Sequence, residues 1–305
     1  MTETASLTAS VYEFLEQYGH RYHRDGKDLL PIDESEQDRL DLQHHIFKMI
    51  LDGELTATKI PQDVQAVLDV GTGTGIWAIE MGEEYPGATI KGLDQAPIQP
   101  SWVPPNVQFE VDDVTKPWER RPNSLDFVHV RSMAGLIKDW SAFLADAYLH
   151  LAPGGMIEVS DFTTRFQCND GTFKQDSYCK QWEVAFHELA VSVFGMDFET
   201  APKMAGWLED AGFVDVQLLT KIVPVGPWPK DRNLKTIGLY HRTHMLDMGF
   251  ENYSMFLFTR GGWDPIEIHS LLAHVRRELK DPRIHTYTTA VFFTARKPEA
   301  KGNDD

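Results

Sequence analysis

Three closely spaced glycines and two acidic residues are the part of this sequence whose types and spacing could do chemistry. In the stretch Val67-Leu-Asp-Val-Gly-Thr-Gly-Thr-Gly-Ile-Trp77, Gly71, Gly73 and Gly75 follow an apolar run directly. Glycine allows tight turns and has no side chain, so a ligand can lie against the backbone. The helix expected after the turn offers free N–H groups. The stretch therefore predicts a nucleotide-type pocket between a strand and a helix.

The two acids stand where such a ligand would need them. Asp69 lies in the predicted strand before the glycines and suits a ligand that carries an ammonium group. Asp94 ends the next apolar run, about 20 residues past the turn, where a carboxylate can accept hydrogen bonds from ribose hydroxyls. An ordinary turn with a capping aspartate is the competing interpretation, and the register of both acids with the glycines disfavours it.

A second kind of nucleotide loop also fits the spacing. Read from Gly73, the chain gives Gly-Thr-Gly-Ile-Trp-Ala78, which matches the dinucleotide fingerprint G-x-G-x-x-G/A. An NAD enzyme therefore stays open as an alternative, although no site for hydride transfer is evident in the sequence.

The middle of the chain alternates predicted strands and helices joined by short links. This order is typical of a parallel sheet with crossover helices. The strands are predicted at 66–70, 88–93, 106–111, 125–130 and 156–159, and the helices at 74–85 and 140–151, the second helix being broken by Pro153-Gly-Gly155. Further helices are predicted at 38–55, around Trp182, at 202–212, 234–248, 253–259 and 265–280, with strands at 213–223 and 285–295.

Composition narrows the classes of function. The 305 residues carry a net charge of −17, which argues against a basic nucleic-acid-binding face. The two cysteines, Cys168 and Cys179, show no metal-type spacing and fit a reducing compartment, so no metal site is expected. No run approaches the roughly 20 apolar residues of a membrane helix. We expect no membrane association and a cytoplasmic protein that could also enter the nucleus.

Several motifs together resemble class I S-adenosylmethionine (SAM) methyltransferases. Asp69 followed by G-x-G-x-G looks like motif I of that class. Gly92-Leu-Asp94 is similar to the ribose-binding acid, and Asp112-Asp113 resembles the acidic turn that receives the adenine amino group. Leu151-Ala-Pro-Gly-Gly155 looks like the helix-to-strand turn of the same class.

Longer matches resemble one subgroup, the fungal LaeA-like methyltransferases of secondary metabolism and its regulation. The residues that carry this resemblance are Tyr22-His23, Asp25-Gly-Lys27, Leu29-Leu-Pro31, Gln43-His44, Leu51-Asp-Gly53, Gly71-Thr-Gly-Thr-Gly-Ile-Trp-Ala78, Pro97-Ile-Gln-Pro-Ser-Trp-Val-Pro-Pro105, Lys138-Asp-Trp140 and Gly226-Pro-Trp-Pro-Lys230. The resemblance implies SAM as the cofactor and methyl transfer as the reaction.

The resemblance also implies the architecture: an α/β, Rossmann-like seven-stranded sheet with a helical N-terminal segment and helical lid insertions. The expected organisation is an N-terminal helical cap (1–60), a SAM-binding core (61–165), a helical insertion (166–200), a core helix and strand (201–224), a helical lid (225–282), the last core strand (283–296) and a disordered tail (297–305).

The resemblance places the cofactor against the strand ends and the acidic turns. The residues expected to bind it are Tyr22, Asp69, Gly71, Thr72, Gly73, Gly75, Asp94, Gln95, Asp112, Asp113, Val114, Val130 and Arg131. Arg131 could contact either the carboxylate of SAM or the acceptor. Tyr22 could bond that carboxylate or place its ring on the sulfonium, although plain core packing would explain it equally well.

The acceptor and any general base are left open. Trp140, Phe162, Trp228 and Phe256 are candidates for an apolar acceptor pocket, with core packing as the commoner explanation for each. His20, His23, His129, His241 and His244 are conceivable bases, and no catalytic residue is assigned. Besides the NAD enzyme, three functions stay open: methyl transfer to a small metabolite, a regulatory methyltransferase in a protein complex that could act on a protein, and a non-catalytic binding module on the same fold.

Overall fold

The computed structural model describes residues 14–23 and 29–300, and its larger sheet has seven strands. Their order across the sheet is β5-β4-β3-β6-β7-β9-β8, with β9 antiparallel to both of its neighbours and the other pairs parallel. The strands are β3 (Ala66–Val70), β4 (Thr89–Asp94), β5 (Val107–Val111), β6 (Leu125–Arg131), β7 (Leu151–Phe162), β8 (Val214–Pro224) and β9 (Tyr287–Arg296). The predicted seven-stranded α/β fold is thus confirmed.

Helices cover both faces of the parallel part of the sheet. The helix α2 (Ile76–Glu84) packs on one face, and α3 (Trp140–His150) and α5 (Ala201–Asp210) pack on the other. Adjacent residues of β3 take opposite sides, since Val67 joins the core under α2 and Leu68 the core under α3. Burial on both faces explains why these strands are continuous apolar runs.

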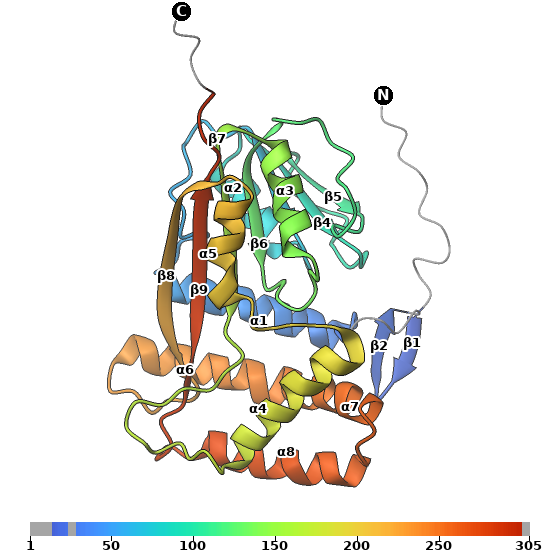
Figure 1. Cartoon of the computed structure of the whole chain (residues 1–305), viewed down its shortest axis with the longest axis vertical. Helices are drawn as coiled ribbons and strands as arrows, with labels where there is room; N and C mark the ends of the chain where they lie inside the picture. The colour runs from blue at the N-terminus through green and yellow to red at the C-terminus, as the bar shows by residue number, and fades with distance from the viewer. Residues whose placement is uncertain (1–13, 24–28, 301–305) are drawn as a thin grey trace, which may run out of the picture.

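A long helix separates the sheet from a helical layer. This helix, α1 (Glu34–Ile50), crosses one end of the sheet, and the helical layer lies beyond it (Figure 1). The layer contains α4 (Tyr178–Leu189), α6 (Arg232–Thr243), α7 (Phe250–Arg260) and α8 (Pro265–Lys280). It has a hydrophobic core of its own, which includes Trp182, Phe256 and Leu272.

Two π-helical turns lie within this layer, η2 (Ala190–Phe194) after α4 and η3 (His244–Gly249) between α6 and α7. The sequence pattern predicts the helices at both places but not the wider turns. Apolar periodicity does not distinguish a π turn from an α turn over so few residues.

The N-terminal segment differs from the expected helical cap. A hairpin of β1 (Phe14–Gln17) and β2 (His20–His23) precedes α1. Its two turn residues, Tyr18 and Gly19, have φ angles of 52° and 78°, the positive values that a two-residue I′ hairpin turn requires. Gly19 is the local signal for this turn, but Tyr is not one of the residues that usually accompany it.

The expected break at Pro153-Gly-Gly155 is also wrong in detail. These residues belong to β7, which starts at Leu151, and the pairing with β6 shifts register between Leu125 and Phe127. The irregular pairing accommodates a proline that cannot donate a ladder hydrogen bond. The predicted tail extends into residues 301–305, and the Asp25-Gly-Lys27 part of the family resemblance falls within residues 24–28. Both ranges lie outside the described residues.

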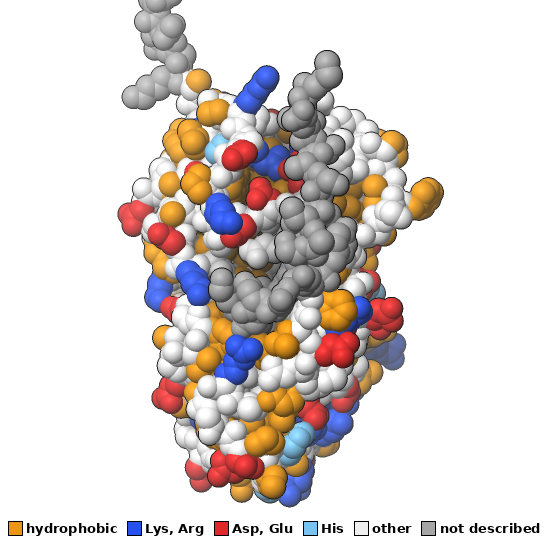
Figure 2. All heavy atoms as spheres, turned by 90° about the vertical axis from the view of Figure 1, so that its right-hand side faces the viewer, with side chains coloured by type: hydrophobic (Ala, Val, Ile, Leu, Met, Phe, Trp, Pro, Cys, Tyr) orange, Lys and Arg blue, Asp and Glu red, His pale blue; other side chains and the backbone are white. Residues whose placement is uncertain are grey.

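The surface is mixed in charge. On the face shown in Figure 2, basic and acidic side chains of the described residues are interspersed, and the basic ones form no continuous surface. No helix in the described part of the chain is long and apolar enough to cross a membrane.

The two leucines of α3 give a matched test of this packing. Leu144 is fully buried in the core, whereas Leu149 is 49% exposed on the same helix. We expect Leu144→Ala to lower the free energy of unfolding by about 2–5 kcal/mol. Leu149→Ala should change it by less than about 0.5 kcal/mol. Urea denaturation followed by circular dichroism measures both, and equal losses would contradict the described orientation of α3.

Candidate functional site

The glycine turn joins β3 to α2 at the carboxyl end of the parallel strands. Gly71, Gly73 and Gly75 all have positive φ angles, which L side chains rarely adopt. A Cβ at Gly71 would collide with Met133, and one at Gly75 with Phe109. These two glycines therefore allow close packing of protein side chains, a reason that differs from the expected bare surface for a ligand.

Asp94 connects the glycine turn to the end of β4. Its Oδ2 accepts a hydrogen bond from the Gly73 amide at 2.8 Å, and its Oδ1 accepts one from the Ala96 amide at 2.9 Å. The Thr72 amide donates to the Leu93 carbonyl next to it. The carboxylate lies against the turn, as the spacing predicts, and each of its oxygens can accept more than one hydrogen bond.

Asp69 supports the turn from below. It is only 3% exposed, and its carboxylate accepts a hydrogen bond from the Thr72 hydroxyl at 2.5 Å and contacts His129 Nδ1 at 2.7 Å. The His129 ring is stacked on Trp77 with 3.8 Å between ring centroids. Asp69 is thus surrounded by protein groups, and His129, a conceivable base, is engaged in the same buried network.

The acidic turn after β5 lies beside Asp94. The Asp112 amide donates to the Asp94 carbonyl, and the Gln95 amide group donates to the Asp113 carboxylate at 3.1 Å. Asp112 is exposed, whereas Val114 is buried among apolar residues. The structure therefore brings together the acids that the sequence assigns to the ribose and to the adenine.

The helix α1 packs directly on the glycine turn. A Cβ at Gly73 would lie 3.3 Å from Leu40, and the Thr74 hydroxyl donates to the Asp41 carboxylate at 2.6 Å. One turn further, His44 faces α2, where its Nε2 lies 3.3 Å from the Glu80 carboxylate. These contacts fix α1 across the strand ends.

Arg131 is the last residue of β6 and contacts α1. Its guanidinium donates to His44 Nδ1 at 3.1 Å and lies 5.2 Å above the centre of the Phe47 ring. No carboxylate of the described residues forms an ion pair with it. Burial lowers the pKa of Arg131 to about 10, which leaves it charged at neutral pH. Burial and the Arg131 charge lower the pKa of His44 to about 4. The Asp69, Glu158 and Glu80 charges act on Arg131 from a distance, and a buried cation with no carboxylate in direct contact at this edge fits an anionic ligand group.

The ends of β6 and β7 carry two polar groups that the sequence does not single out. Ser132, just after β6, has a φ of 59°, and its buried hydroxyl has no partner among the described residues. On β7, the Asp161 carboxylate accepts a hydrogen bond from the Ala134 amide at 2.9 Å. Burial raises the pKa of Asp161 to about 7. Asp161 gives no sequence signal that would set it apart from Glu158 on the same strand, because its environment comes from distant residues.

Tyr22 comes from the hairpin and lies in the helical layer. Its ring is fully buried and stacked on Phe256 with 4.2 Å between centroids. Its hydroxyl has no partner among the described residues. Burial raises the pKa of Tyr22, with the nearby Asp33 and Glu36 charges adding to the effect. Tyr22 and Phe256, two residues singled out from the sequence, are thus neighbours.

The other candidates for an acceptor pocket occupy packing positions. Trp140 belongs to the core under α3, and Phe162 is stacked between Phe47 and the helical layer. Trp228 donates its indole N–H to the Thr286 carbonyl and stacks on His285. Val130, expected at the cofactor, is fully buried in the sheet. Core packing accounts for Trp140, Phe162 and Val130, whereas Trp228 is half-buried in the loop after β8 and is held by Thr286 and His285.

The remaining candidate bases are held by neighbours. His20 bonds the Asp33 carboxylate, and His244 Nε2 accepts a hydrogen bond from Arg39. His241 contacts the Thr288 hydroxyl, and burial lowers its pKa to about 4. Both His241 and His244 keep one ring nitrogen without a partner among the described residues. Phe162 lies against both rings, on the side away from Phe47.

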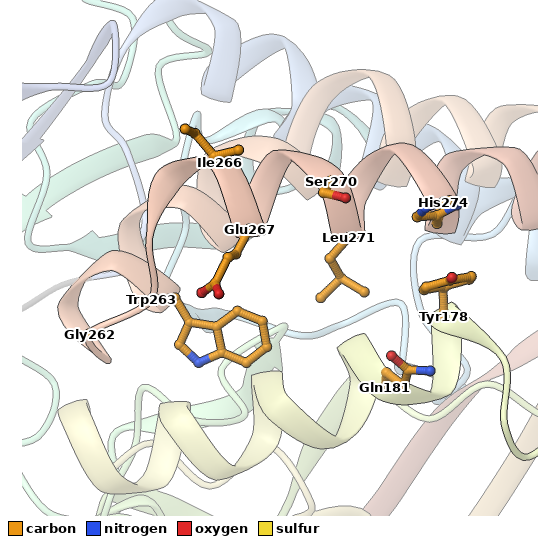
Figure 3. A pocket seen from close by; sticks show the side chains of 9 residues that line it. All are labelled: Tyr178, Gln181, Gly262, Trp263, Ile266, Glu267, Ser270, Leu271 and His274. Carbon is orange, nitrogen blue, oxygen red and sulfur yellow. The ribbon is translucent and has the colours of Figure 1, made fainter.

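A separate groove of about 670 Å³ lies within the helical layer between α4 and α8 (Figure 3). Tyr178 and His274 stack at one end of it, and Trp263 and Glu267 lie at the other. None of the residues that line it belongs to the strand ends. The described residues contain no group of three metal-ligating side chains.

Known proteins similar to this chain share one domain type. A family model described as a methyltransferase domain matches residues 42–218. Methyltransferase pytC of Aspergillus terreus is 41% identical over 300 residues, which cover 96% of this chain and 91% of that protein. Secondary metabolism regulator LAE1 of Cochliobolus heterostrophus is 34% identical over 291 residues, 92% of this chain and 94% of that protein.

A solved structure shares the fold at low sequence identity. Phosphoethanolamine N-methyltransferase 2 of Haemonchus contortus, in complex with phosphomonomethylethanolamine and S-adenosylhomocysteine, aligns with a TM-score of 0.54 and 18% identity. The alignment covers 90% of this chain and 60% of that one. At this identity the likeness concerns the fold alone.

The raised pKa of Asp161 predicts a pH-dependent stability. Because the folded state holds this proton more tightly than the unfolded chain, stability is present at low pH and is lost as pH rises from about 4 towards about 7. Asp161→Asn keeps a hydrogen-bond acceptor and removes the titration. We expect it to raise the free energy of unfolding by about 1–2 kcal/mol at pH 8 and by less at pH 5.5. Guanidinium denaturation at both pH values measures this, and an equal change at both would contradict the assignment.

Proposed function

This chain belongs to the SAM-dependent methyltransferases and resembles their LaeA-like members, and we propose that it transfers the methyl group of SAM to a small secondary metabolite. The observation that carries the proposal is the Asp94 carboxylate at the end of β4, bound to the Gly73 amide. It provides a ribose-binding group next to a turn of three glycines, at the strand ends where ligands of such sheets bind.

The described residues fit SAM at each of its parts. Asp94 would accept the ribose hydroxyls, and the acidic turn of Asp112 and Asp113 with the Val114 backbone would receive the adenine. Gln95 would stay with Asp113, which it already contacts. Because its carboxylate is occupied by Thr72 and His129, Asp69 would shape the turn rather than bind an ammonium group.

The amino-acid end of SAM would lie towards Arg131. Its guanidinium is a cation at this edge, and no carboxylate of the described residues forms an ion pair with it. Tyr22 offers its hydroxyl, because Phe256 already covers one face of its ring. Each of these two side chains is a candidate partner for the cofactor carboxylate, and the acceptor is the other candidate partner of Arg131.

SAM supplies a methyl group on a sulfonium, which a nucleophile displaces in line. The chain would supply alignment and exclusion of water. The helical layer and α1 close over the strand ends, and the tie between Thr74 and Asp41 keeps α1 against the turn. Fixing both reactants in this way lowers the entropic part of the barrier.

Catalytic methyl transfer is supported by pytC, a relative whose name states a methyltransferase and which is similar over nearly its full length. The alternative is a regulatory methyltransferase that works with a protein partner, supported by the likeness to LAE1. The net charge of −17 disfavours direct contact with nucleic acid under either proposal. We place the small-molecule activity in the cytoplasm, and the regulatory one would extend to the nucleus.

Methyl-labelled SAM separates the two proposals. The purified chain is incubated with labelled SAM and either the low-molecular-weight or the protein fraction of a fungal lysate. Label in extractable metabolites supports the first proposal, and label retained on protein supports the second. Absence of transfer to either fraction would favour a non-catalytic binding module.

Asp94 provides a sharp test of cofactor binding. Asp94→Ala should weaken SAM binding about 10- to 100-fold, because hydrogen bonds to a charged group contribute about 1.5–3 kcal/mol. Asp126→Ala is the matched control, since this carboxylate also accepts from two backbone amides, those of Gln65 and Ala66, at the opposite end of β3. Isothermal titration with SAM, and with NAD as the competing ligand, measures the affinities. Equal losses in both variants, or binding of NAD but not SAM, would overturn the assignment.

Arg131 can be tested with two ligands that differ at one end. Arg131→Gln should weaken S-adenosylhomocysteine binding about tenfold, because the carboxylate of the ligand loses its cationic partner. It should leave the affinity for 5′-methylthioadenosine nearly unchanged, since that ligand has no amino-acid end. Arg131→Lys, which keeps the charge, should fall between. If both ligands lose affinity equally, Arg131 supports the fold of the site or faces the acceptor.

A further inference from the structure

The methyl acceptor must approach the strand ends beside the cofactor, where β6 and β7 lie side by side. Arg131 pairs with Ser160 in the register of these strands, and the Ser132 amide donates to the Ser160 carbonyl at 2.9 Å. The Ala134 amide then reaches the Asp161 carboxylate. Ser132 and Asp161 therefore occupy adjacent positions on neighbouring strand ends.

The backbone at Ser132 is strained, and its side chain is unsatisfied. A φ of 59° is unfavourable for a residue other than glycine, and such strain is found preferentially at functional sites. The Ser132 hydroxyl is buried without a partner among the described residues, a cost that a ligand oxygen would remove.

The Asp161 carboxyl is the only acid at these two strand ends among the described residues, and it remains partly exposed. The amides of Ala134 and Phe162 donate to it. Val291 lies opposite Asp161 on β9, Arg131 ends the neighbouring strand β6, and His241 and His244 lie against Phe162, the next residue of β7, which takes the other face of the sheet. None of these groups forms an ion pair with Asp161 in the described part of the chain.

We propose that Asp161 is the general base of the methyl transfer and that the acceptor is a hydroxyl-bearing metabolite whose oxygen lies between the Asp161 carboxylate and the Ser132 hydroxyl. This inference rests on the proposed function and adds to it the reacting atom and the residue that takes the proton. The elevated pKa of Asp161, near 7, makes its carboxylate a stronger base than an ordinary aspartate while leaving it ionised at slightly alkaline pH.

The proton and electron balance of the step is simple. A lone pair of the acceptor oxygen forms the new C–O bond, and the C–S bond breaks with its electron pair going to sulfur. The hydroxyl proton passes to Asp161, which then releases it to solvent. The Ser132 hydroxyl donates a hydrogen bond to the acceptor oxygen and orients it.

The proposal separates oxygen acceptors from sulfur acceptors. A phenolic hydroxyl has a pKa of about 10 and is almost wholly protonated at neutral pH, so its methylation depends on a base. A thiol ionises at lower pH and reacts as the thiolate without a base. Two probes with the same ring system, 2-naphthol and 2-naphthalenethiol, therefore differ in how much they need Asp161.

The experiment measures methyl transfer from SAM to both probes as a function of pH. We expect the wild-type kcat/KM for 2-naphthol to rise through pH 7 and then level. Asp161→Asn should lower it about 100-fold, remove the inflection near pH 7 and leave a rate that follows the ionisation of the naphthol. The same variant should change the rate with 2-naphthalenethiol by less than about threefold.

Two further variants separate the roles. Ser132→Ala should raise the KM for 2-naphthol about three- to tenfold, as the loss of one hydrogen bond predicts, and should keep the inflection near pH 7. Asp126→Asn, a carboxylate bound to backbone amides at the far end of the sheet, is the control and should leave both rates unchanged. Isothermal titration should show the same SAM affinity in all variants.

Each negative outcome of these experiments contradicts a different claim. If the wild-type chain does not bind SAM, the proposed function is wrong. If it binds SAM but does not methylate 2-naphthol, or if Asp161→Asn slows both probes equally at every pH, the assignment of Asp161 and of a hydroxyl acceptor is overturned.

Discussion

The amide of Gly73 donates a hydrogen bond to the carboxylate of Asp94, and this contact joins the ends of the two central strands. It fixes the path of the glycine turn, because the same carboxylate also binds the Ala96 amide at the start of the next loop. Below the turn, the buried group of Asp69, His129 and Thr72 supports it through hydrogen bonds between distant parts of the chain. The shape of the cofactor edge therefore depends on charge-assisted hydrogen bonds to backbone, which are among the stronger ones in proteins.

The helix α1 transmits this geometry to the rest of the molecule. On one side it contacts the turn through Leu40 and Asp41, and on another it binds the helical layer through Arg39 and His244. The Tyr253 hydroxyl donates to Glu36, which adds a link to α7. The helical layer has a hydrophobic core of its own, and a further core cluster joins α1 and α6 to β7, β8 and β9, so α1 and α6 together set the position of the layer on the sheet. Contacts made by α1 consequently bear on both the cofactor edge and the acceptor side.

The local sequence pattern was sufficient to predict the elements with strong periodicity and the acids that follow strands. The turn at Gly71 to Gly75, the carboxylate of Asp94 and the positions of the core strands along the chain could be predicted because each leaves a short-range signature. The hairpin at Tyr18-Gly19 carries only one typical turn residue. Asp161 and Ser132 have no signature, since their character comes from burial by segments far away in sequence. The packing of Trp140 shows the reverse case, in which an aromatic residue in a family motif serves the core.

The structure of the chain crystallised with S-adenosylhomocysteine tests the central claim most directly. The account predicts that the ribose hydroxyls lie within hydrogen-bond distance of the Asp94 carboxylate and that the sulfur lies over the ends of β6 and β7, on the side of Asp161. A nucleoside bound elsewhere, such as the groove between α4 and α8, or an Asp94 carboxylate directed away from the ribose, would contradict it.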